Sequence, residues 1–206
     1  MSTTPPTDAH PAAALRWRTV DLVTTVMIGV VFGVIFIGWG SVTNLAGPLF
    51  LALPPLSGLL GGFWWLPAVV AALVIRRPGA ALLAELVAAS VEPLLGGQWG
   101  LATLASGVIQ GLGVELGFLL FAYRRPTVVP AVLGGALAGL LETPYEWSVY
   151  YPEWVPGWAL LYGTTMTVSG ALIAGIGGFA LTKALARTGV LAPFPLGRAH
   201  AESRRV

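Results

Sequence analysis

The sequence predicts an all-α integral membrane protein with six transmembrane helices, both termini in the cytoplasm and a second helix that is kinked or broken. Three observations predict this class. The 206 residues are 56% apolar and only 10% charged, with a mean hydropathy of +0.80. The apolar residues gather in runs that approach or exceed the roughly 20 residues needed to cross a bilayer. The basic residues all lie in the tails or near the ends of these runs.

Short connections separate the six predicted spans. The spans cover approximately residues 22–39, 48–75, 80–95, 101–123, 128–150 and 159–181. The first is expected to end in a turn, Gly40 to Gly47. The second contains Pro54-Pro55, Gly61-Gly62 and Pro67. Because proline removes a backbone hydrogen bond and clashes with the preceding turn, this density of helix breakers predicts a kinked or broken helix.

Two tails are expected to flank the membrane domain, which covers residues 17–189. Residues 1–16 are rich in Pro, Ala and Thr and have little apolar surface to bury, so they are predicted to be a disordered cytoplasmic tail. Residues 190–206 are predicted to form a basic cytoplasmic tail. The apolar run after Arg16 and Arg18 is too long for a typical signal peptide and lacks a convincing cleavage site, so we interpret it as a span.

The basic residues predict the orientation. In a six-span protein the N-terminus, the second-to-third connection, the fourth-to-fifth connection and the C-terminus share one side. These places hold all eleven Lys and Arg residues: Arg16, Arg18, Arg76, Arg77, Arg124, Arg125, Lys183, Arg187, Arg198, Arg204 and Arg205. Because connections rich in Lys and Arg stay in the cytoplasm, both termini are predicted to be cytoplasmic.

Acidic residues inside the spans point to a polar interior. Five of the nine acids lie inside or at the ends of predicted spans: Glu85, Glu92, Glu115, Glu142 and Glu146. A carboxylate in hydrocarbon costs at least about 2.5–3.5 kcal/mol, so such residues are expected to face the interior. With no basic residue to neutralise them there, they predict an acid-lined site for a positively charged or hydrogen-bond-donating small molecule.

Helical spacing places four of these acids in two pairs, each on one helix face. Glu85 and Glu92 are seven apart and share one helix face, as do Glu142 and Glu146, which are four apart. Glu92 and Glu146 lie near the predicted outer mouth and are expected to contact the ligand. For Glu85 and Glu115, hydrogen bonding to neighbouring helices or connections is an equally good interpretation.

Aromatic residues concentrate on the predicted outer side. Trp and Tyr commonly anchor proteins at the depth of the lipid headgroups, which is the simpler interpretation for any one of them. The cytoplasmic ends carry few aromatics, however, and rings beside carboxylates can bind a flat cation by stacking and cation–π attraction. The residues concerned are Trp99, Tyr145, Trp147, Tyr150, Tyr151, Trp154, Trp158 and Tyr162.

Small residues at helical spacing give a weaker signal. Gly29 and Gly33 are four apart on the first predicted span. This spacing allows two helices to approach closely. The contact can be packing within the bundle, or a docking surface for another membrane subunit, and we predict docking for these two glycines.

The sequence lacks the residues and motifs that several functions require. There is no Cys, and the only histidines, His10 and His200, lie in the tails, so neither a metal site nor a Ser–His hydrolase is predicted. No cofactor is expected. There is no GxxxxGK[ST] motif, so ATP hydrolysis would need partner subunits. The basic residues are spread over a membrane surface and do not predict nucleic-acid binding.

Four stretches of the sequence resemble one family. The run Ile75-Arg-Arg-Pro-Gly-Ala-Ala-Leu-Leu-Ala-Glu85, continuing to Glu92 and Leu95-Gly96, is similar to the YkoE-type substrate-binding (S) components of energy-coupling factor (ECF) transporters. So are Gly107-Val-Ile-Gln110-Gly-Leu-Gly-Val-Glu115, the pair Tyr145-Glu146, and Ser169-Gly-Ala-Leu-Ile-Ala-Gly175 with the later Thr188-Gly-Val-Leu. The resemblance covers roughly Trp17 to Arg198.

The resemblance implies a multi-pass protein of the bacterial cytoplasmic membrane that captures thiamine or its hydroxymethylpyrimidine (HMP) precursor from outside. It also implies two kinds of partner, a transmembrane coupling (T) subunit and cytoplasmic ATPase subunits. The residues that match the family pattern are Glu85, Glu92, Gln110, Glu115, Tyr145 and Glu146. In the ligand site this implies, Trp99, Tyr145 and Trp147 would stack on the rings and Gln110 would bind a pyrimidine edge. Glu142 departs from the pattern, because a small residue is expected there.

Three other functions stay open at this point. A standalone proton-coupled carrier of a small cation or amine would use the intramembrane acids as a relay. The chain is short for such a carrier and shows no clear internal repeat. A scaffold without transport activity is indicated only by the small-residue faces, and an enzyme acting on lipid is the most distant of the three.

Overall fold

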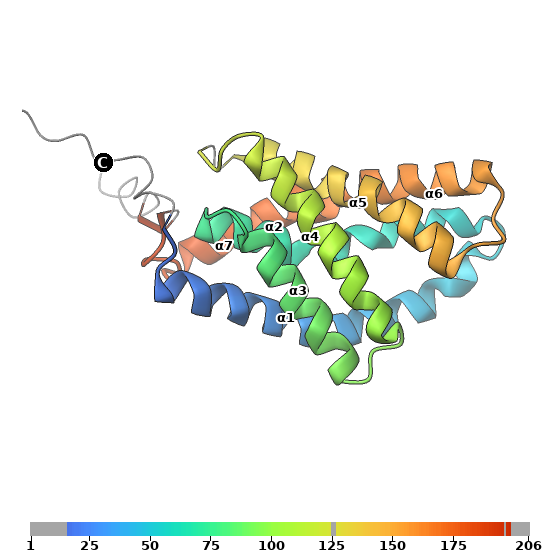
Figure 1. Cartoon of the computed structure of the whole chain (residues 1–206), viewed down its shortest axis with the longest axis horizontal. Coiled ribbons are helices and arrows are strands. Elements are labelled where there is room, and N and C mark those ends of the chain that lie inside the picture. The colour runs from blue at the N-terminus through green and yellow to red at the C-terminus, as the bar shows by residue number, and fades with distance from the viewer. Residues whose placement is uncertain (1–15, 125–126, 196, 199–206) are drawn as a thin grey trace, which may run out of the picture.

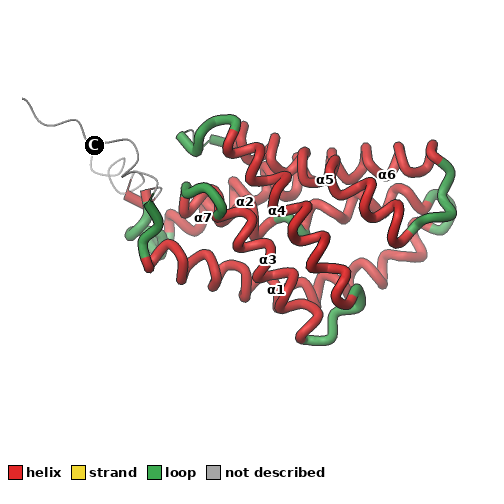
Figure 2. Tube along the Cα trace, in the orientation of Figure 1, coloured by secondary structure: helices red, strands yellow, loops and turns green. Residues whose placement is uncertain are grey.

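The computed structural model describes residues 16–124, 127–195 and 197–198, and the regular structure in these ranges is entirely helical (Figures 1 and 2). Five helical segments in this part of the chain are long and apolar enough to cross a membrane: Thr19–Phe50, Pro54–Ile75, Gly100–Leu119, Val128–Tyr150 and Pro156–Arg187. The predicted all-α membrane class is therefore confirmed, whereas six spans and cytoplasmic termini stay predictions.

Helix α1 (Thr19–Ala46) is longer than predicted. It continues as a 3-10 turn over Gly47–Phe50, so the expected turn at Gly40 to Gly47 is wrong. The hydroxyls of Ser41 and Thr43 donate to the carbonyls of Ile37 and Gly40 within the helix, so these polar residues extend α1 and do not end it. The α-helical hydrogen bonding ends at Pro48, because proline has no backbone N–H to donate to a carbonyl of the preceding turn.

The second segment is broken, as predicted. A 3-10 helix (Pro54–Phe63, η3) precedes helix α2 (Leu66–Ile75). Side chains of helix α6 (Pro156–Ser169) bind the backbone of the 3-10 stretch. Ser169 Oγ accepts from the amide of Gly62 at 2.9 Å and donates to the carbonyl of Leu59 at 2.6 Å. These bonds satisfy polar groups that a buried segment rich in Pro and Gly leaves without an α-helical partner.

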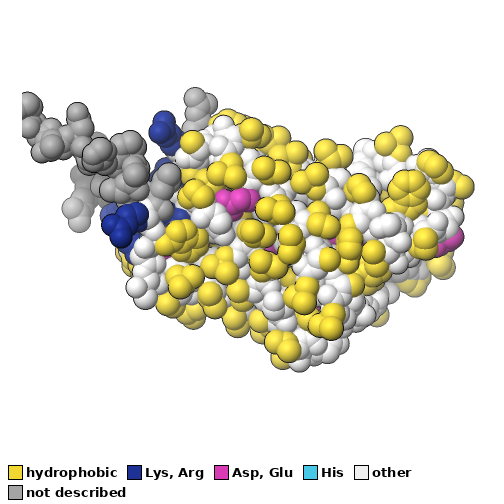
Figure 3. All heavy atoms as spheres, in the orientation of Figure 1, with side chains coloured by type: hydrophobic (Ala, Val, Ile, Leu, Met, Phe, Trp, Pro, Cys, Tyr) yellow, Lys and Arg dark blue, Asp and Glu magenta, His cyan; other side chains and the backbone are white. Residues whose placement is uncertain are grey.

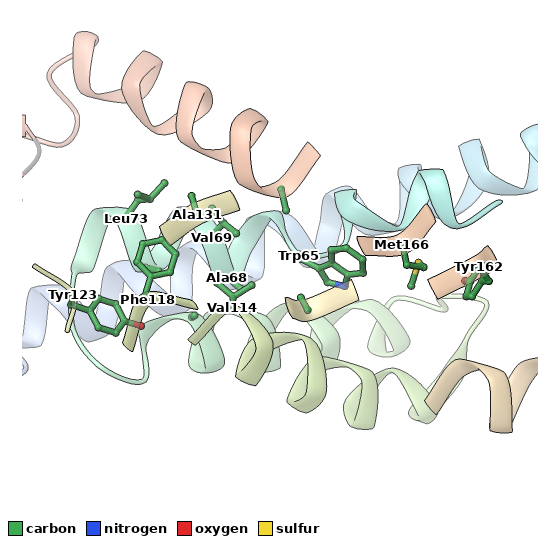
Figure 4. Packing of buried hydrophobic residues seen from close by; sticks show 14 of the residues in the cluster. Trp65, Ala68, Val69, Leu73, Val114, Phe118, Tyr123, Ala131, Tyr162 and Met166 are labelled. Atoms are coloured by element: carbon green, nitrogen blue, oxygen red, sulfur yellow. The ribbon is translucent and has the colours of Figure 1, made fainter. Parts of the chain in front are cut away.

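Helix α2 is the centre of the fold. All ten of its residues, LPAVVAALVI, are buried. It contacts α1, α3, α4, α5 and α7. In Figure 4 the side chains of Ala68, Val69 and Leu73 lie in the core that also contains Val114 and Phe118 of α4.

The next elements build one side of the bundle. Helix α3 (Ala80–Leu94) packs against α1 and α4, and a short 3-10 turn (Gly100–Ala102) leads into α4 (Thr103–Leu119). Helix α5 (Val128–Tyr150) has the predicted bounds and packs on α4. With 15 residues, α3 is shorter than the roughly 17–25 residues of a membrane-spanning helix, which is why the third predicted span, and with it a total of six, is not confirmed.

The last span is one continuous helical segment. It begins with α6, passes through a π-helical stretch (Gly170–Gly177) and ends with α7 (Gly178–Arg187). Beyond it, Leu191 and Phe194 are buried in a core cluster with α1 and α2 residues. The packed part of the chain thus extends past the predicted boundary at residue 189. The rest of the predicted basic tail, residues 196 and 199–206, and residues 1–15 of the predicted disordered tail lie outside the described residues.

Both ends of the described chain lie at one end of the bundle, together with the α2–α3 and α4–α5 connections (Figure 1). Lys and Arg side chains gather at this end, while apolar side chains cover the length of the visible face (Figure 3). Asp21, in the first turn of α1, holds the α2–α3 connection in place. Its carboxylate lies 2.6 Å from the Arg18 guanidinium and 3.6 Å from Nε of Arg77, which belongs to that connection. Arg125, Arg204 and Arg205 lie outside the described residues.

The face of α1 that carries Gly29 and Gly33 is not free for docking. Both glycines are buried against α3. A methyl group on Gly29 would lie 2.6 Å from the carbonyl oxygen of Ala84, and one on Gly33 would lie 2.6 Å from Cβ of Val91. The structure thus corrects the predicted docking role, because these glycines let α1 and α3 pack closely within the chain.

Glycine also sets the α4–α5 contact, and this gives a prediction. A methyl group on Gly113 would lie 2.5 Å from Cα of Ala138, which is backbone and cannot turn away. Gly113→Ala is expected to lower the free energy of unfolding by about 1–3 kcal/mol. The measurement is the thermal unfolding midpoint in detergent. Gly38→Ala is the control, because nothing lies within 4 Å of a methyl group at that helical position, and a midpoint lowered equally there would contradict the packing argument.

Candidate functional site

A cavity of about 320 Å³ lies between the helices, within the roughly 300–1,000 Å³ typical of small-molecule sites. Its walls come from α1, α3, α4, α5 and α6, the 3-10 helix η3 and the α5–α6 connection. The last residues of α1 and α5 and the first residue of α4 take part, so the cavity extends toward the end of the bundle opposite Thr19 and Arg187. This is the predicted outer end.

The lining is acidic and aromatic. Three carboxyl groups contribute to it, those of Glu85, Glu92 and Glu146. None of the described residues that line it is Lys, Arg or His. The aromatic lining residues are Phe36, Phe50, Trp64, Trp99, Tyr150, Tyr151, Trp154 and Tyr162, and the uncharged polar ones include Asn44, Ser57, Thr103, Ser106 and Gln110. Such a site favours a cationic or hydrogen-bond-donating ligand with flat rings.

Glu85 forms the deep end of the acidic wall and is only 1% exposed. Its Oε2 accepts a hydrogen bond of 3.3 Å from the backbone amide of Ala68, in the first turn of α2. The first amides of a helix have no partner within the helix, and the helix dipole favours an anion there. Glu85 therefore holds the start of α2 and also lines the cavity, while its contact with a ligand stays a prediction.

Glu92 lies on the same face of α3, about 10 Å further along the helix axis given the rise of about 1.5 Å per residue. It is 3% exposed and lines the cavity. It also lines a second hollow of about 220 Å³ between α1 and the α3–α4 connection. Asn44 Nδ2 donates to Gln98 Oε1 at 2.5 Å across this hollow, so one side-chain bond holds the connection against α1.

Glu146 lies at the α5–α6 side of the cavity. The hydroxyl of Tyr162, on α6, donates a hydrogen bond to Glu146 Oε2. The rings of Tyr151 and Trp154 stack with centroids 4.0 Å apart, and the Tyr162 ring stands edge-on to both at 5.5 and 5.4 Å. Burial, and secondarily the Glu146 carboxylate, raise the pKa of Tyr151 to about 12, so its hydroxyl stays protonated at physiological pH.

Three of the predicted contact residues lie outside the cavity lining. Tyr145 donates its hydroxyl to the carbonyl of Ala102 at 3.0 Å. Trp147 donates its indole N–H to the carbonyl of Trp154 at 3.1 Å and thereby anchors the α5–α6 connection. Glu115 accepts from the amides of Gly79 and Ala81, at 2.6 and 3.2 Å, and so holds the start of α3 at the opposite end of the bundle.

The position of Glu115 gives a second prediction. Removing it leaves two amide donors at the buried start of α3 without their acceptor, which costs about 1–3 kcal/mol per group left unsatisfied. Glu115→Ala is therefore expected to lower the thermal unfolding midpoint in detergent by several degrees. Glu153→Ala is the matched control, since this acid lies exposed in the α5–α6 connection. Equal midpoints for the two variants would contradict the assigned role.

Glu142 is a fourth acid close to the cavity. It is fully buried one helical turn from Glu146, and its polar neighbours include Ser106 and Gln110 of the cavity wall. Among the described residues neither of its oxygens has a hydrogen-bond partner. It does not line the cavity itself and lies behind its wall.

Part of the lining carries no clear signal in the sequence. Phe36 and Trp64 pack edge to face at 4.7 Å and form a wall for which no ligand contact is predicted. Tyr162 belongs to the predicted outer aromatics, again without a predicted contact. It lies 16 residues from Glu146, on the next helix, so helical spacing cannot reveal that the two residues bind each other. The pairing becomes visible only once α5 and α6 are packed.

Three comparisons place the chain among known proteins. Residues 20–141 match the family model described as the permease component of an ABC-type cobalt transport system. The chain is 35% identical over 195 residues to the putative HMP/thiamine permease protein YkoE of Bacillus subtilis (strain 168), covering 92% of this chain and 94% of that protein. A crystal structure of an S component of an ECF transporter superposes with a TM-score of 0.85 at 33% identity, covering 92% of this chain and 96% of the other.

Proposed function

This chain belongs to the YkoE family of ECF-transporter S components, multi-pass permeases of the cell membrane, and we propose that it captures thiamine or HMP at the outer face. It would deliver the ligand inward together with a T subunit and ATPase subunits. In this proposal the membrane domain has six spans and the cavity opens to the outside, opposite the Arg-rich connections.

The observation that carries the proposal is the composition of the cavity wall. Thiamine has a permanently charged thiazolium ring and a flat aminopyrimidine, and HMP retains only the second of these. Three carboxyl groups without a basic residue among the described lining residues favour a cation or an amino group. The aromatic side chains supply faces for both rings. Gln110 and Ser106 add neutral hydrogen-bonding groups that can bind the pyrimidine edge.

The description of the matched family model raises cobalt as a second cargo. A metal ion of this type is usually held by several His, Cys or carboxylate side chains that converge on one point. Within the described residues no group of three or more such side chains could hold a metal ion. The cavity chemistry therefore favours the organic cation over the metal ion.

The alternative function that a structural observation supports is a proton-coupled carrier. Buried Glu142, without a hydrogen-bond partner among the described residues, lies beside Glu146 and is the kind of intramembrane acid that proton relays use. The test is uptake of radiolabelled thiamine into proteoliposomes containing this chain alone or the complete complex with T and ATPase subunits. Uptake only by the complex with ATP supports the S-component proposal. Uptake by the chain alone, driven by a proton gradient, would contradict it.

A further inference from the structure

Glu142 is a buried acid that neither the packing of the helices nor the proposed ligand site uses. It is fully buried on α5, and neither of its oxygens has a hydrogen-bond partner among the described residues. Its polar neighbours include Ser106 and Gln110 of α4, and Glu146 lies one turn further along α5. These three residues line the cavity, whereas Glu142 does not. Glu142 therefore lies directly behind a polar part of the cavity wall.

The other three acids of this region each have a group that stabilises their negative charge. Glu85 accepts a hydrogen bond from an amide at the start of α2, where the helix dipole also favours an anion. Glu146 accepts from a tyrosine hydroxyl of α6. Glu92 borders both hollows, so water can reach its carboxyl group. Glu142 has no such group among the described residues, and an ionised carboxylate that is buried without a partner is very costly. In the empty site, Glu142 is thus the acid that holds a proton.

No positive charge opposes the negative ones around Glu142 in the described part of the chain. The helices α2 and α7, η3 and the π-helical stretch also pack on α5, but the first, third and fourth contain no titratable residue, and α7 carries Lys183 and Arg187 at the opposite end of the bundle. From α4 it faces the neutral groups of Ser106 and Gln110. The titratable groups that interact with it belong to α3, α5 and α6 and are acids or phenols: Glu85, Tyr145, Glu146, Tyr150 and Tyr162.

We propose that Glu142 is a proton-binding site, and that capture of a cation in the cavity displaces this proton. The inference rests on the proposed function, in which the cation is thiamine. The O–H bond of Glu142 breaks, its electron pair stays on the carboxylate, and the proton passes the polar wall to water in the cavity. One positive charge enters as another leaves, so the occupied site has the same net charge as the empty one.

A bound cation is close enough to drive this exchange. Glu146 lies four residues from Glu142, which is about 6 Å along the helix axis. A unit positive charge about 7 Å from a carboxyl group lowers its proton affinity about 50-fold at an effective dielectric constant of about 20. A cation bound beside Glu146 therefore changes the energetic balance at Glu142 without touching it.

The exchange differs from a proton relay across the membrane. Toward the opposite end of the bundle the described acids are already bound: Glu115 accepts two backbone amides, and Asp21 is paired with Arg18 and Arg77. The proton of Glu142 has no unbound carboxyl group to move to in that direction among the described residues. It leaves on the side where the ligand enters, so the exchange sets the affinity for the ligand and does not drive transport.

The experiment counts the protons that the purified full chain releases when it binds thiamine. Isothermal titration calorimetry at one pH near neutrality, in phosphate and in Tris, gives this number, because the buffers differ in the heat of taking up a proton. About one proton per bound thiamine is expected. Because binding releases a proton, thiamine affinity should rise with pH between about 6 and 8, by at most about tenfold per pH unit.

Glu142→Gln tests the assignment to this residue. The variant keeps the size of the side chain but has no proton to exchange, so it should release none and its affinity should not change with pH. Any titration of thiamine itself is common to the variant and the unsubstituted chain and cancels in the comparison. Glu153→Gln is the matched control, since this acid lies exposed in the α5–α6 connection and outside the cavity lining. It should release about one proton, as the unsubstituted chain does.

Two results would overturn the inference. The first is thiamine binding by the unsubstituted chain without proton release, which needs no variant and so does not depend on whether Glu142→Gln folds. The second is proton release that persists in folded Glu142→Gln, because another group would then be its source. Failure of the unsubstituted chain to bind thiamine at all would instead overturn the proposed function.

Discussion

Replacing Glu146 or Glu92 by glutamine is expected to weaken thiamine binding by about 10- to 100-fold, because each substitution removes a charged interaction worth about 1.5–3 kcal/mol. Both residues line the cavity, toward its proposed outer mouth, and glutamine keeps the size of the side chain while removing its charge. The measurement is the dissociation constant of each purified variant by calorimetry. The double variant should bind too weakly for the titration to saturate.

Glu115→Gln is the control for this pair. Glu115 is also a buried acid, but it binds backbone amides at the start of α3 and does not line the cavity. Its variant should bind thiamine as the unsubstituted chain does. Unchanged affinity in both the Glu92 and Glu146 variants would remove these carboxylates from the proposed contact.

The second large effect concerns the charge of the ligand. Thiamine diphosphate carries the same two rings with an anionic tail, and we expect it to bind at least about 100-fold more weakly than thiamine. The tail would enter a cavity that has three carboxyl groups and no basic side chain among its described lining residues. Two like charges about 4 Å apart repel by about 4 kcal/mol at an effective dielectric constant of about 20, which is more than a 100-fold loss of affinity requires.

Competition against radiolabelled thiamine measures this discrimination. Thiamine monophosphate should fall between thiamine and the diphosphate, because it carries less negative charge. Salt should have little effect on the order of the three affinities, since buried charges are screened much less than exposed ones. A diphosphate that competes as well as thiamine would show that the acidic wall does not face the ligand.

Much of the fold follows from the one-dimensional pattern. The Pro and Gly residues of the second predicted span predict a break in it, and the structure divides this span into η3 and α2. The end of α1 could not be predicted in this way. Gly40 is normally a weak helix residue, but here it packs near Gln98 and Trp64, and this tertiary contact keeps it helical.

Helical geometry predicts part of the cavity lining. Glu85 and Glu92 share a face and both line the cavity, as their spacing requires. Tyr145 and Trp147 are one residue from Glu146, and adjacent residues on a helix do not face the same way. Only Glu146 of these three lines the cavity. The bond from Tyr162 could not be predicted, because it joins two helices whose relative rotation is set by glycine contacts such as that between Gly139 and Met166.

The central claim is that this chain alone captures the ligand. Its most direct test is the tryptophan fluorescence of the detergent-purified chain, titrated separately with thiamine and with HMP. Eight tryptophans are present, and Trp64, Trp99 and Trp154 line the cavity, so occupancy should change the signal. The account predicts saturable quenching with one ligand per chain, and tighter binding of thiamine than of HMP. No response to either ligand, from protein shown to be folded, would contradict the account and favour the ion-coupled carrier.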